Sequence, residues 1–478
     1  MKVAIVHYHL QPGGVTRVIE STIQSWENND FSSVEYVVLT GRPYSGKKLR
    51  KVEVVEGLDY ADAEDSVHPA TLKDNLERAA LAALGGRPDI WHIHNHTLGK
   101  NPALTQAVAL LAQSGARLFL QPHDFAEDGR PQNFKNLAGS QEVLYPTANQ
   151  IHYAALNRRD QGFLQNLNQG LSSPVHLLAN AIPPTPEKTL GKGSIRDIPD
   201  NLFLYPVRAV RRKNLGELAL LSAAYPEIHF ANSLGPTNPS FLSLYQEWVA
   251  FSSSHRLGLS YGLGEQTEAS FPEMVNSAQS IINVSVAEGF GLGFLEPWTY
   301  GKSLCGRNIP EITSDFTDLG VNLQNLYDEI WIDPSMIDMS QLKQEVTQSL
   351  NSIYSDYNHP LPQHALQRAM IGLSSEKGIK FGCLNETLQR SIIKKILNSE
   401  LASQSVRDQS RLCVLSPSKI ETNRLAVKNN FSLQSYGQRV LEIYEALLSS
   451  EVEAVSFADG NGMLEQFLIP ERLNLLRT

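Results

Sequence analysis

The sequence of 478 residues contains only three cysteines, Cys305, Cys383 and Cys413, far apart along the chain. So few and so scattered thiols exclude a disulfide framework and a cysteine-rich zinc site. No run of 18 apolar residues occurs, so no segment is predicted to cross a membrane. The amino terminus, Met1–His7, has a short apolar stretch that predicts a strand and not a signal peptide. These absences predict a cytoplasmic protein without stable membrane association.

An excess of positive charge is missing as well. The chain has 41 Lys and Arg against 50 Asp and Glu, a formal net charge of −9. No global basic field attracts nucleic acid or anionic lipid, so we expect neither as a partner. The hydrophobic fraction of 42% is ordinary for a globular protein. At this length it supplies two or three cores, not one.

The glycine fingerprint of dinucleotide-binding proteins is absent too. The loop after the first expected strand, His7–Val15, contains Gly13 and Gly14 but not the Gly-x-Gly-x-x-Gly pattern. This disfavours a nicotinamide-dependent oxidoreductase. Two adjacent glycines allow a ligand to approach the backbone closely. A plain tight turn between a strand and a helix is the alternative interpretation.

What the chain does have is an alternation of strand-like and helix-like runs. The alternation covers about the first 185 residues, breaks in a Pro-, Lys- and Gly-containing segment near 183–199, and restarts at Leu202. This predicts two doubly wound α/β domains joined by a linker. In such sheets, ligands bind beyond the carboxyl ends of the strands. Residues 314–428 contain helix-like runs but no recognisable chemistry.

The most informative run is Glu288–Glu296, which has two carboxylates separated by three glycines and four apolar residues. The β-rich run 280–284 precedes it, and Pro297 follows it, a residue that suits the first turn of a helix. The predicted order is strand, glycine loop, helix. Such a loop presents backbone N–H groups to phosphate or sugar hydroxyls. The alternative is a glycine-rich turn with two solvated glutamates.

This run resembles the Glu-x7-Glu motif of the retaining glycosyltransferases of family 4, which have the GT-B fold. A second match is the run 208–214, in which Arg208 and Lys213 keep the five-residue offset of the family's Gly-Arg and Lys-Gly pairs. Val207 and Asn214 replace the two glycines, which leaves the loop shape open. A third match is Gln121-Pro-His-Asp124, where His123 stands at a strand end.

The cations of the second match suit a reaction that releases a diphosphate. Negative charge develops on the phosphate oxygens as the glycosidic bond breaks, and it must be stabilised. Arg208 offers a bidentate fork and Lys213 a compact point charge. We expect the neighbouring Arg211 and Arg212 to be ordinary surface charges.

Histidines form a further group. His92, His94 and His96 alternate along one expected strand, which predicts that their rings point the same way. His7, His9, His96 and His123 fall at or just past strand ends. Three interpretations stay open: zinc ligands, structural histidines, or an acceptor-binding wall to which Asn95, Lys100 and Arg130 contribute. Asp124 caps a helix together with His123, or acts as a general base in an inverting enzyme.

The resemblance implies a role for each matching residue. It places His123, Glu288, Arg208 and Lys213 in catalysis. It places the donor nucleotide sugar on Gly13, Gly14, Arg208, Lys213, Glu288, Phe290, Gly291, Leu292 and Glu296. The polar residues expected at the acceptor are His9, His94, His96, Asp124 and Arg130.

The resemblance also implies an architecture: a Rossmann-like acceptor domain at 1–185 and a Rossmann-like nucleotide-sugar domain at 200–425, across a cleft, then a closing helix at 426–450 that returns to the first domain and a tail at 451–478. The implied activity is transfer of a hexose from a UDP- or GDP-sugar to a hydroxyl of a small hydrophilic acceptor. Configuration is retained, and neither a metal nor a cofactor is needed. The alternatives are a nucleotide-sugar epimerase or a phosphorylase of the same fold, and a non-catalytic binder of sugar nucleotides.

Overall fold

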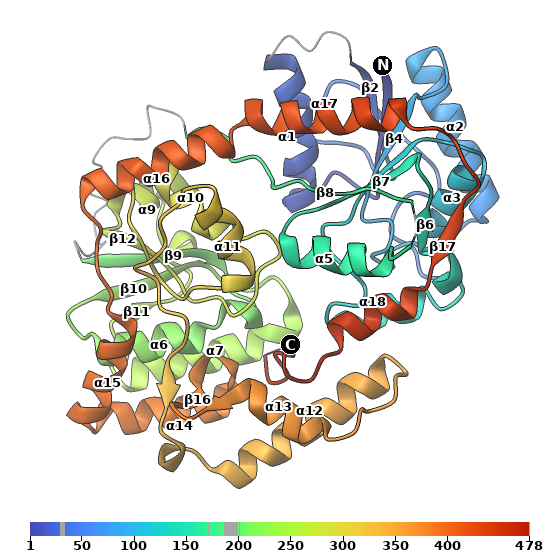
Figure 1. Ribbon diagram of the computed structural model, residues 1–478. Helices are drawn as coiled ribbons and strands as arrows, with labels where there is room; N and C mark the ends of the chain where they lie inside the picture. Colours follow the sequence, from blue (N-terminus) through green and yellow to red (C-terminus); the bar gives the residue numbers. More distant parts are fainter. Residues whose placement is uncertain (29–33, 171, 186–198, 200, 478) are drawn as a thin grey trace. The chain divides into compact units, whose positions relative to one another are not determined.

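The computed structural model describes residues 1–28, 34–170, 172–185, 199 and 201–477 (Figure 1). The predicted linker lies largely outside these residues. The chain divides into two compact units, each assembled from three stretches of sequence. Unit 1 comprises Met1–Pro183, Ile353–His359 and Asn430–Ile469, and unit 2 comprises Pro184–Ser352, Pro360–Asn429 and Pro470–Thr478.

Unit 1 is built on a seven-stranded sheet in the order β3-β2-β1-β4-β5-β7-β8, in which every neighbouring pair is parallel. Its strands are β1 (Lys2–His7), β2 (Glu35–Thr40), β3 (Val52–Val54), β4 (Ile90–His94), β5 (Leu118–Gln121), β7 (Ile151–Ala155) and β8 (Val175–Leu177). Its helices are α1 (Gly14–Asn28), α2 (Pro69–Leu84), α3 (Pro102–Gln113), α4 (Pro131–Asn136), α5 (Arg158–Leu167), α17 (Leu433–Ser449) and α18 (Gly460–Phe467). Strand and helix alternate, as the sequence predicted.

Helix α17 completes the core of unit 1. It lies beside α1 (Figure 1), and its Tyr436, Val440 and Tyr444 are buried in the same apolar cluster as residues of β1 and α1. The Tyr444 hydroxyl also lies 2.8 Å from Nδ1 of His92 on β4. The predicted closing helix at 426–450 is therefore two helices, because α16 (Pro417–Asn430) ends before Ser432 caps α17.

The region beyond 451 holds more structure than the predicted tail. Strand β17 (Ser456–Ala458) pairs with β6 (Tyr145–Thr147) in an antiparallel ribbon, and α18 follows it. Among the described residues, no helix is long and apolar enough to span a bilayer.

Unit 2 contains a five-stranded parallel sheet in the order β11-β10-β9-β12-β13. Its strands are β9 (Leu202–Arg208), β10 (His229–Leu234), β11 (Leu259–Ser260), β12 (Ser280–Asn283) and β13 (Leu304–Gly306). The helices that alternate with these strands are α6 (Leu215–Ala224), α7 (Pro239–Ser254), α8 (Leu263–Gln266), α9 (Phe271–Ser277), α10 (Glu296–Thr299) and α11 (Pro310–Asp318). This is a second doubly wound α/β sheet.

The stretch without recognisable motifs, 314–428, adds a helical layer and a small antiparallel sheet to unit 2. The sheet consists of β14 (Trp331–Ile332), β16 (Gly378–Lys380) and β15 (Ser374–Ser375). The helices are α13 (Ala365–Leu373), α14 (Glu386–Leu397), α15 (Glu400–Ser410) and α16, together with α12 (Met339–Asp356), whose last residues belong to unit 1.

Candidate functional site

The carboxyl ends of three neighbouring strands of unit 2, β10, β9 and β12, gather the residues singled out in the sequence. Arg208 is the last residue of β9 and is exposed, and its Nη1 donates to the carbonyl of Gly235, just past β10, at 3.2 Å. Lys213 follows in the one-turn helix η3 (Arg211–Lys213), and its Nζ donates to Oε1 of Glu288, beyond β12. Two cations and one carboxylate thus share one edge of the sheet.

The pairing of β9 with β10 has a β-bulge just before Arg208. Between the pairs Tyr205–Asn232 and Arg208–Leu234, β9 advances three residues while β10 advances two. The extra residue falls at Pro206 and Val207. Proline lacks a backbone N–H and is tolerated at such a bulge. Val207 lies within the strand, so the glycine it replaces is not needed there for a left-handed conformation.

Asn214, which replaces the second glycine of the family pattern, takes the conformation that a glycine could take there. It adopts a left-handed conformation, φ 53° and ψ 52°, which asparagine tolerates better than most side chains. Its buried side chain is also held, because Nδ2 donates to Glu217 at 2.9 Å and Oδ1 accepts from Gln389 at 3.0 Å. The turn after Lys213 therefore keeps the backbone shape that glycine would give.

The run Glu288–Glu296 forms the predicted strand, loop and helix, but the helix is short. Strand β12 precedes the loop, a single turn η4 (Leu292–Phe294) lies inside it, and Glu296 begins the four-residue α10. Gly291 has φ +91°, and a Cβ there would lie 2.9 Å from Ile312 Cγ2, so this position requires glycine. The ring of Phe290 is buried against Phe316, with ring centroids 5.6 Å apart.

A buried network of ion pairs lies next to the turn at this edge of the sheet. Arg307 forms a bidentate pair with Glu217, at 2.9 and 2.6 Å, and both side chains are almost completely buried. Tyr327 donates to the same carboxylate at 2.7 Å, and Glu329 accepts from Arg307 at 2.6 Å. Because Glu217 also binds Asn214, the network reaches the turn that carries Lys213.

Arg211 is not the plain surface charge that the sequence suggested. It is half-buried and pairs with Glu386, whose side chain is 5% exposed. Arg212, by contrast, is exposed. Its carbonyl accepts from the N–H of Val286 at 2.9 Å, which ties the turn to the segment that leads into the glycine loop.

In unit 1, three of the predicted histidines gather at the carboxyl ends of β1, β4 and β5. Nδ1 of His94 lies 2.8 Å from Nε2 of His123, and the rings of His7 and His94 are 6.1 Å apart. Burial lowers the pKa of His7 and of His123 to about 3, and the pKa of His94 well below its ordinary value. These imidazoles are neutral at physiological pH.

His96 departs from the expected alternation. Asn95 has φ +56°, which ends the regular strand before His96. The His96 ring instead bonds through Nε2 to the carbonyl of Leu144 at 3.2 Å and lies near Tyr153. The prediction that the rings of His92, His94 and His96 all point one way is therefore wrong for His96.

Asn95 organises the loop that follows β5. Its Oδ1 accepts from the backbone N–H groups of His123, at 2.6 Å, and Asp124, at 3.2 Å. Asp124 in turn accepts from Nη2 of Arg130 at 2.5 Å. His9 packs edge-on against Tyr60, with ring centroids 4.6 Å apart.

Gly13 and Gly14 lie exposed at the start of α1. Neither has a positive φ. A Cβ on Gly14 would meet no atom within 4 Å, and one on Gly13 would only touch Gln11 O at 3.7 Å. Neither the backbone nor the neighbouring atoms require glycine here, so open space lies over this loop.

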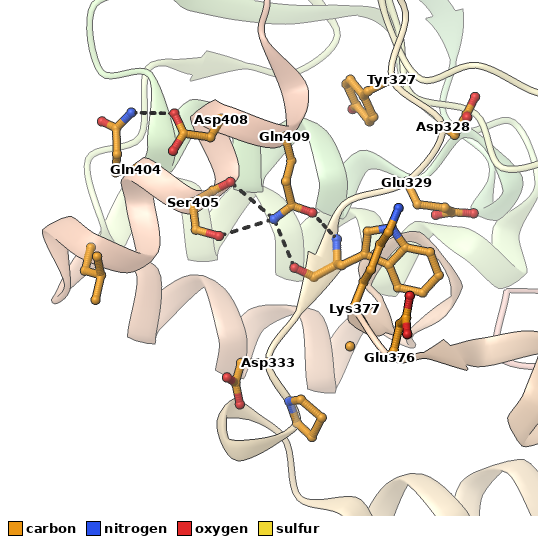
Figure 2. Close-up of a pocket in the computed structure, with 14 residues that line it drawn as sticks. Tyr327, Asp328, Glu329, Asp333, Glu376, Lys377, Gln404, Ser405, Asp408 and Gln409 are labelled. Carbon is orange, nitrogen blue, oxygen red and sulfur yellow. Dashed lines mark hydrogen bonds between the residues drawn. The ribbon is translucent and has the colours of Figure 1, made fainter.

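A cavity of about 930 Å³ lies elsewhere in unit 2, and none of the donor or acceptor residues predicted from the sequence lines it. It is lined by residues of the stretch 327–409, among them the acidic Asp328, Glu329, Asp333, Glu376 and Asp408 (Figure 2). Gln409 closes one wall through two hydrogen bonds with the backbone of Trp331, at 2.7 and 3.1 Å. Within the described part of the chain, no group of three or more His, Cys, Asp or Glu side chains has a geometry that suits a metal ion.

Comparison with known proteins agrees with this architecture, although no family model matches the chain. Mannosylglucosyl-3-phosphoglycerate synthase of Petrotoga mobilis is 25% identical over 440 residues, which cover 83% of each chain. A glycosyltransferase of Rickettsia africae has a TM-score of 0.54 at 14% identity, over 94% of this chain and 99% of that one. Anabaena HepE in complex with UDP and glucose has a TM-score of 0.52 at 10% identity, over 93% and 100%. The protein therefore has the GT-B fold, as the sequence predicted, and is related in sequence to a glycosyltransferase along most of its length.

Proposed function

We propose that this protein is a hexosyltransferase that moves a hexose from a UDP- or GDP-sugar to a hydroxyl group of a small hydrophilic acceptor. The observation that carries the proposal is the contact of Lys213 with Glu288 beside Arg208 at one sheet edge. Cations suited to a diphosphate and a carboxylate suited to sugar hydroxyls meet there. The likeness to a structure that contains UDP and glucose supports it.

The donor is assigned to unit 2. Arg208 and Lys213 stabilise the charge that develops on the departing diphosphate. Glu288 accepts from hydroxyls of the hexose, and the backbone amides of the loop at Phe290, Gly291 and Leu292 bind its hydroxyls or phosphate. Glu296 accepts from the ribose hydroxyls. Gly13 and Gly14 of unit 1 leave open space for close approach of the donor or the acceptor to the backbone.

Transfer proceeds with retention of configuration, as in family 4, and without a metal. The departing phosphate oxygen takes the proton of the acceptor hydroxyl, so no enzymic base is required. Two observations support this mechanism over inversion. Burial makes His123 a poor base at neutral pH, and Asp124 is engaged with Arg130 and the Asn95 loop. His123 flanks the hexose as a neutral hydrogen-bonding group.

The acceptor is a small polar molecule with a negative charge. The product named for the Petrotoga relative joins a mannosyl group to a glucosyl-phosphoglycerate. A glycosylated phosphoglycerate is therefore the first acceptor class to test, with mannose as the first hexose. His9, His94, His96, Asp124 and Arg130 of unit 1 are the candidate residues for acceptor binding. Of these, His94 and His96 are the least accessible, because both are almost completely buried.

The test is to incubate the full chain with UDP- and GDP-hexoses, with and without glucosyl-3-phosphoglycerate. We expect release of the nucleotide diphosphate that depends on the acceptor and persists in EDTA. NMR of the product should show the anomeric configuration of the donor. A changed sugar without any acceptor would identify an epimerase, and phosphate-dependent release of a sugar phosphate would identify a phosphorylase. Calorimetric binding without turnover would identify a non-catalytic binder.

A further inference from the structure

The segment Pro470–Arg477 belongs to unit 2, although α18 directly before it belongs to unit 1. Ion pairs attach its start to unit 2, one between Arg368 and Glu471 at 2.5 Å and one between Arg472 and Glu311 at 2.9 Å. Leu475 and Leu476 are buried. The segment ends against the turn that carries Lys213, so a distant part of the sequence lies behind the candidate donor site.

Arg477 makes the contact with that turn. Its side chain is 2% exposed, and its Nη2 donates to the backbone carbonyl of Arg211 at 2.7 Å. The same carbonyl accepts from the N–H of Asn214 at 2.9 Å, the bond that closes η3 around Lys213. Arg477 therefore fixes the carbonyl oxygen of Arg211, which also accepts the hydrogen bond that closes this turn.

The contact is part of a larger polar network, in which Nε of Arg477 is the one guanidinium nitrogen of this side chain without a hydrogen-bond partner. Nη1 of Arg477 donates to Oε1 of Glu386 at 3.0 Å. Arg211 donates to both oxygens of Glu386, each at 3.2 Å, and to the carbonyl of Leu476 at 2.9 Å. A buried guanidinium is costly unless each partner is in place. Here the network links α14, η3 and the final segment in one arrangement.

We propose that Arg477 is a positioning residue for the donor diphosphate: by fixing the carbonyl of Arg211 it sets the turn and hence the direction of Lys213. The identity of the ligand rests on the proposed function, whereas the control of the turn does not. Arg477 itself is too deeply buried to touch the donor. Its effect passes through the backbone from Arg211 to Lys213.

The binding test compares Arg477→Ala and Arg477→Lys with Arg472→Ala in the full chain. Lysine keeps a charge opposite Glu386 but lacks the planar fork that serves two acceptors, so it covers the case in which the alanine variant fails to fold. We expect both Arg477 variants to bind UDP or GDP about tenfold more weakly by calorimetry, the factor of one lost charged hydrogen bond. Arg472→Ala, which removes an exposed ion pair of the same segment, should bind normally.

Two further readouts separate positioning from general destabilisation. Guanidinium at sub-denaturing concentration should restore nucleotide affinity to Arg477→Ala but not to Arg477→Lys. Hydrogen exchange of the Asn214 amide should accelerate in both Arg477 variants and not in Arg472→Ala. If the unaltered protein binds neither nucleotide, the proposed function fails, and the exchange rates alone decide the inference. Unchanged Asn214 exchange, or unchanged affinity in a protein that binds nucleotide, overturns it.

Discussion

Lys213 donates a hydrogen bond to Glu288 across 75 residues of sequence. The contact joins the turn after β9 to the glycine loop after β12, and both side chains are mostly buried, 16% and 12% exposed. The two charges therefore neutralise each other. Under the proposed function, a diphosphate would compete with Glu288 for Lys213 and would leave the carboxylate to accept from sugar hydroxyls.

Removal of either donor cation should reduce transfer strongly. We expect Arg208→Ala and Lys213→Ala each to lower kcat/KM by about 10²-fold, since each removes one charged contact to the leaving group. Arg212→Ala is the matched control, because this side chain is exposed on the same turn. Steady-state kinetics with the donor varied measures all three. Near-normal rates in both cation variants would contradict the diphosphate assignment.

Glu296 should act on the nucleotide and not on the hexose. We expect Glu296→Ala to raise the KM for the donor by about 10- to 100-fold, the range of a charged hydrogen bond. With the unaltered enzyme, a donor that lacks a ribose hydroxyl should show the same rise in KM. With Glu296→Ala, removal of that hydroxyl should raise the KM no further. Glu268→Ala, an exposed carboxylate of unit 2, is the control. Additive losses from the deoxy donor and Glu296→Ala would remove the ribose assignment.

The two glycine loops should respond in opposite ways to alanine. Gly14→Ala fits the backbone and meets no neighbour, so we expect a stability gain of about 0.4–1 kcal/mol. Its activity should nevertheless fall, because the methyl group fills the space over the loop. Gly291→Ala should lower stability, since its φ is +91° and its Cβ would crowd Ile312. Chemical denaturation and kcat/KM measure both changes. Full activity in Gly14→Ala would argue against ligand approach at this loop.

The stability of unit 1 should fall in mild acid. Burial lowers the pKa of eight histidines in unit 1: to about 3 for His7 and His123, to about 4 for His92, His96 and His152, and below the ordinary value for His9, His94 and His176. The unfolded chain takes up protons near pH 6.5 and the folded chain does not, so the free energy of unfolding falls as pH drops from 6.5 toward 4. Each buried histidine contributes up to about 1.4 kcal/mol per pH unit.

Two buried carboxyl groups of unit 1, Glu127 and Asp160, work against this trend, because burial raises the pKa of each. Burial raises the pKa of Glu127 to about 7, so its contribution to stability is lost as pH rises from 4.5 to 7. The histidines outnumber these two carboxyl groups, and the net effect is a loss of stability in acid. Denaturant midpoints at pH 7, 6 and 5 measure this loss. His7→Asn should make the free energy of unfolding depend less steeply on pH, by the contribution of one histidine. A free energy of unfolding that does not change between pH 7 and pH 5 would contradict the burial of these histidines away from water.

The Glu217–Arg307 pair should be important for stability. Glu217→Gln leaves the guanidinium of Arg307 buried without its full partner, and we expect a loss of about 3–5 kcal/mol. Arg424→Ala breaks an exposed pair with Glu421 and should change stability by less than about 1 kcal/mol. Urea denaturation compares the two. Similar small losses in both variants would show that water reaches Arg307.

Local patterns predicted the backbone conformation at the candidate donor site of unit 2 well. The apolar run at 280–284, the glycines and Pro297 each specify a local conformation, and together they form the expected strand, loop and helix. The alternation of strands and helices predicted the two doubly wound sheets, and the GT-B fold that the resemblance implied is likewise confirmed. The assigned roles of Glu288, Glu296, Arg208 and Lys213 stay predictions that the experiments above address.

Long-range contacts were beyond local patterns. Nothing around Arg477 marks it as buried, and its partners Arg211 and Glu386 lie 266 and 91 residues away. Arg211 was misjudged for the same reason, since a run of charges gives no sign of a buried carboxylate opposite one member. His96 was misjudged because alternation assumes a continuous strand, whereas Asn95 leaves the strand conformation.

The order in which unit 1 acquires its residues has a consequence for synthesis in the cell. The apolar surfaces of α1 and the sheet have emerged from the ribosome long before Tyr436, Val440 and Tyr444 of α17, which cover them. Until α17 has been synthesised, unit 1 exposes this apolar surface, which is prone to aggregation, while unit 2 is being translated. Recombinant fragments that stop near residue 185 should accordingly aggregate, and chimaeras with relatives should exchange α17 together with the first 183 residues.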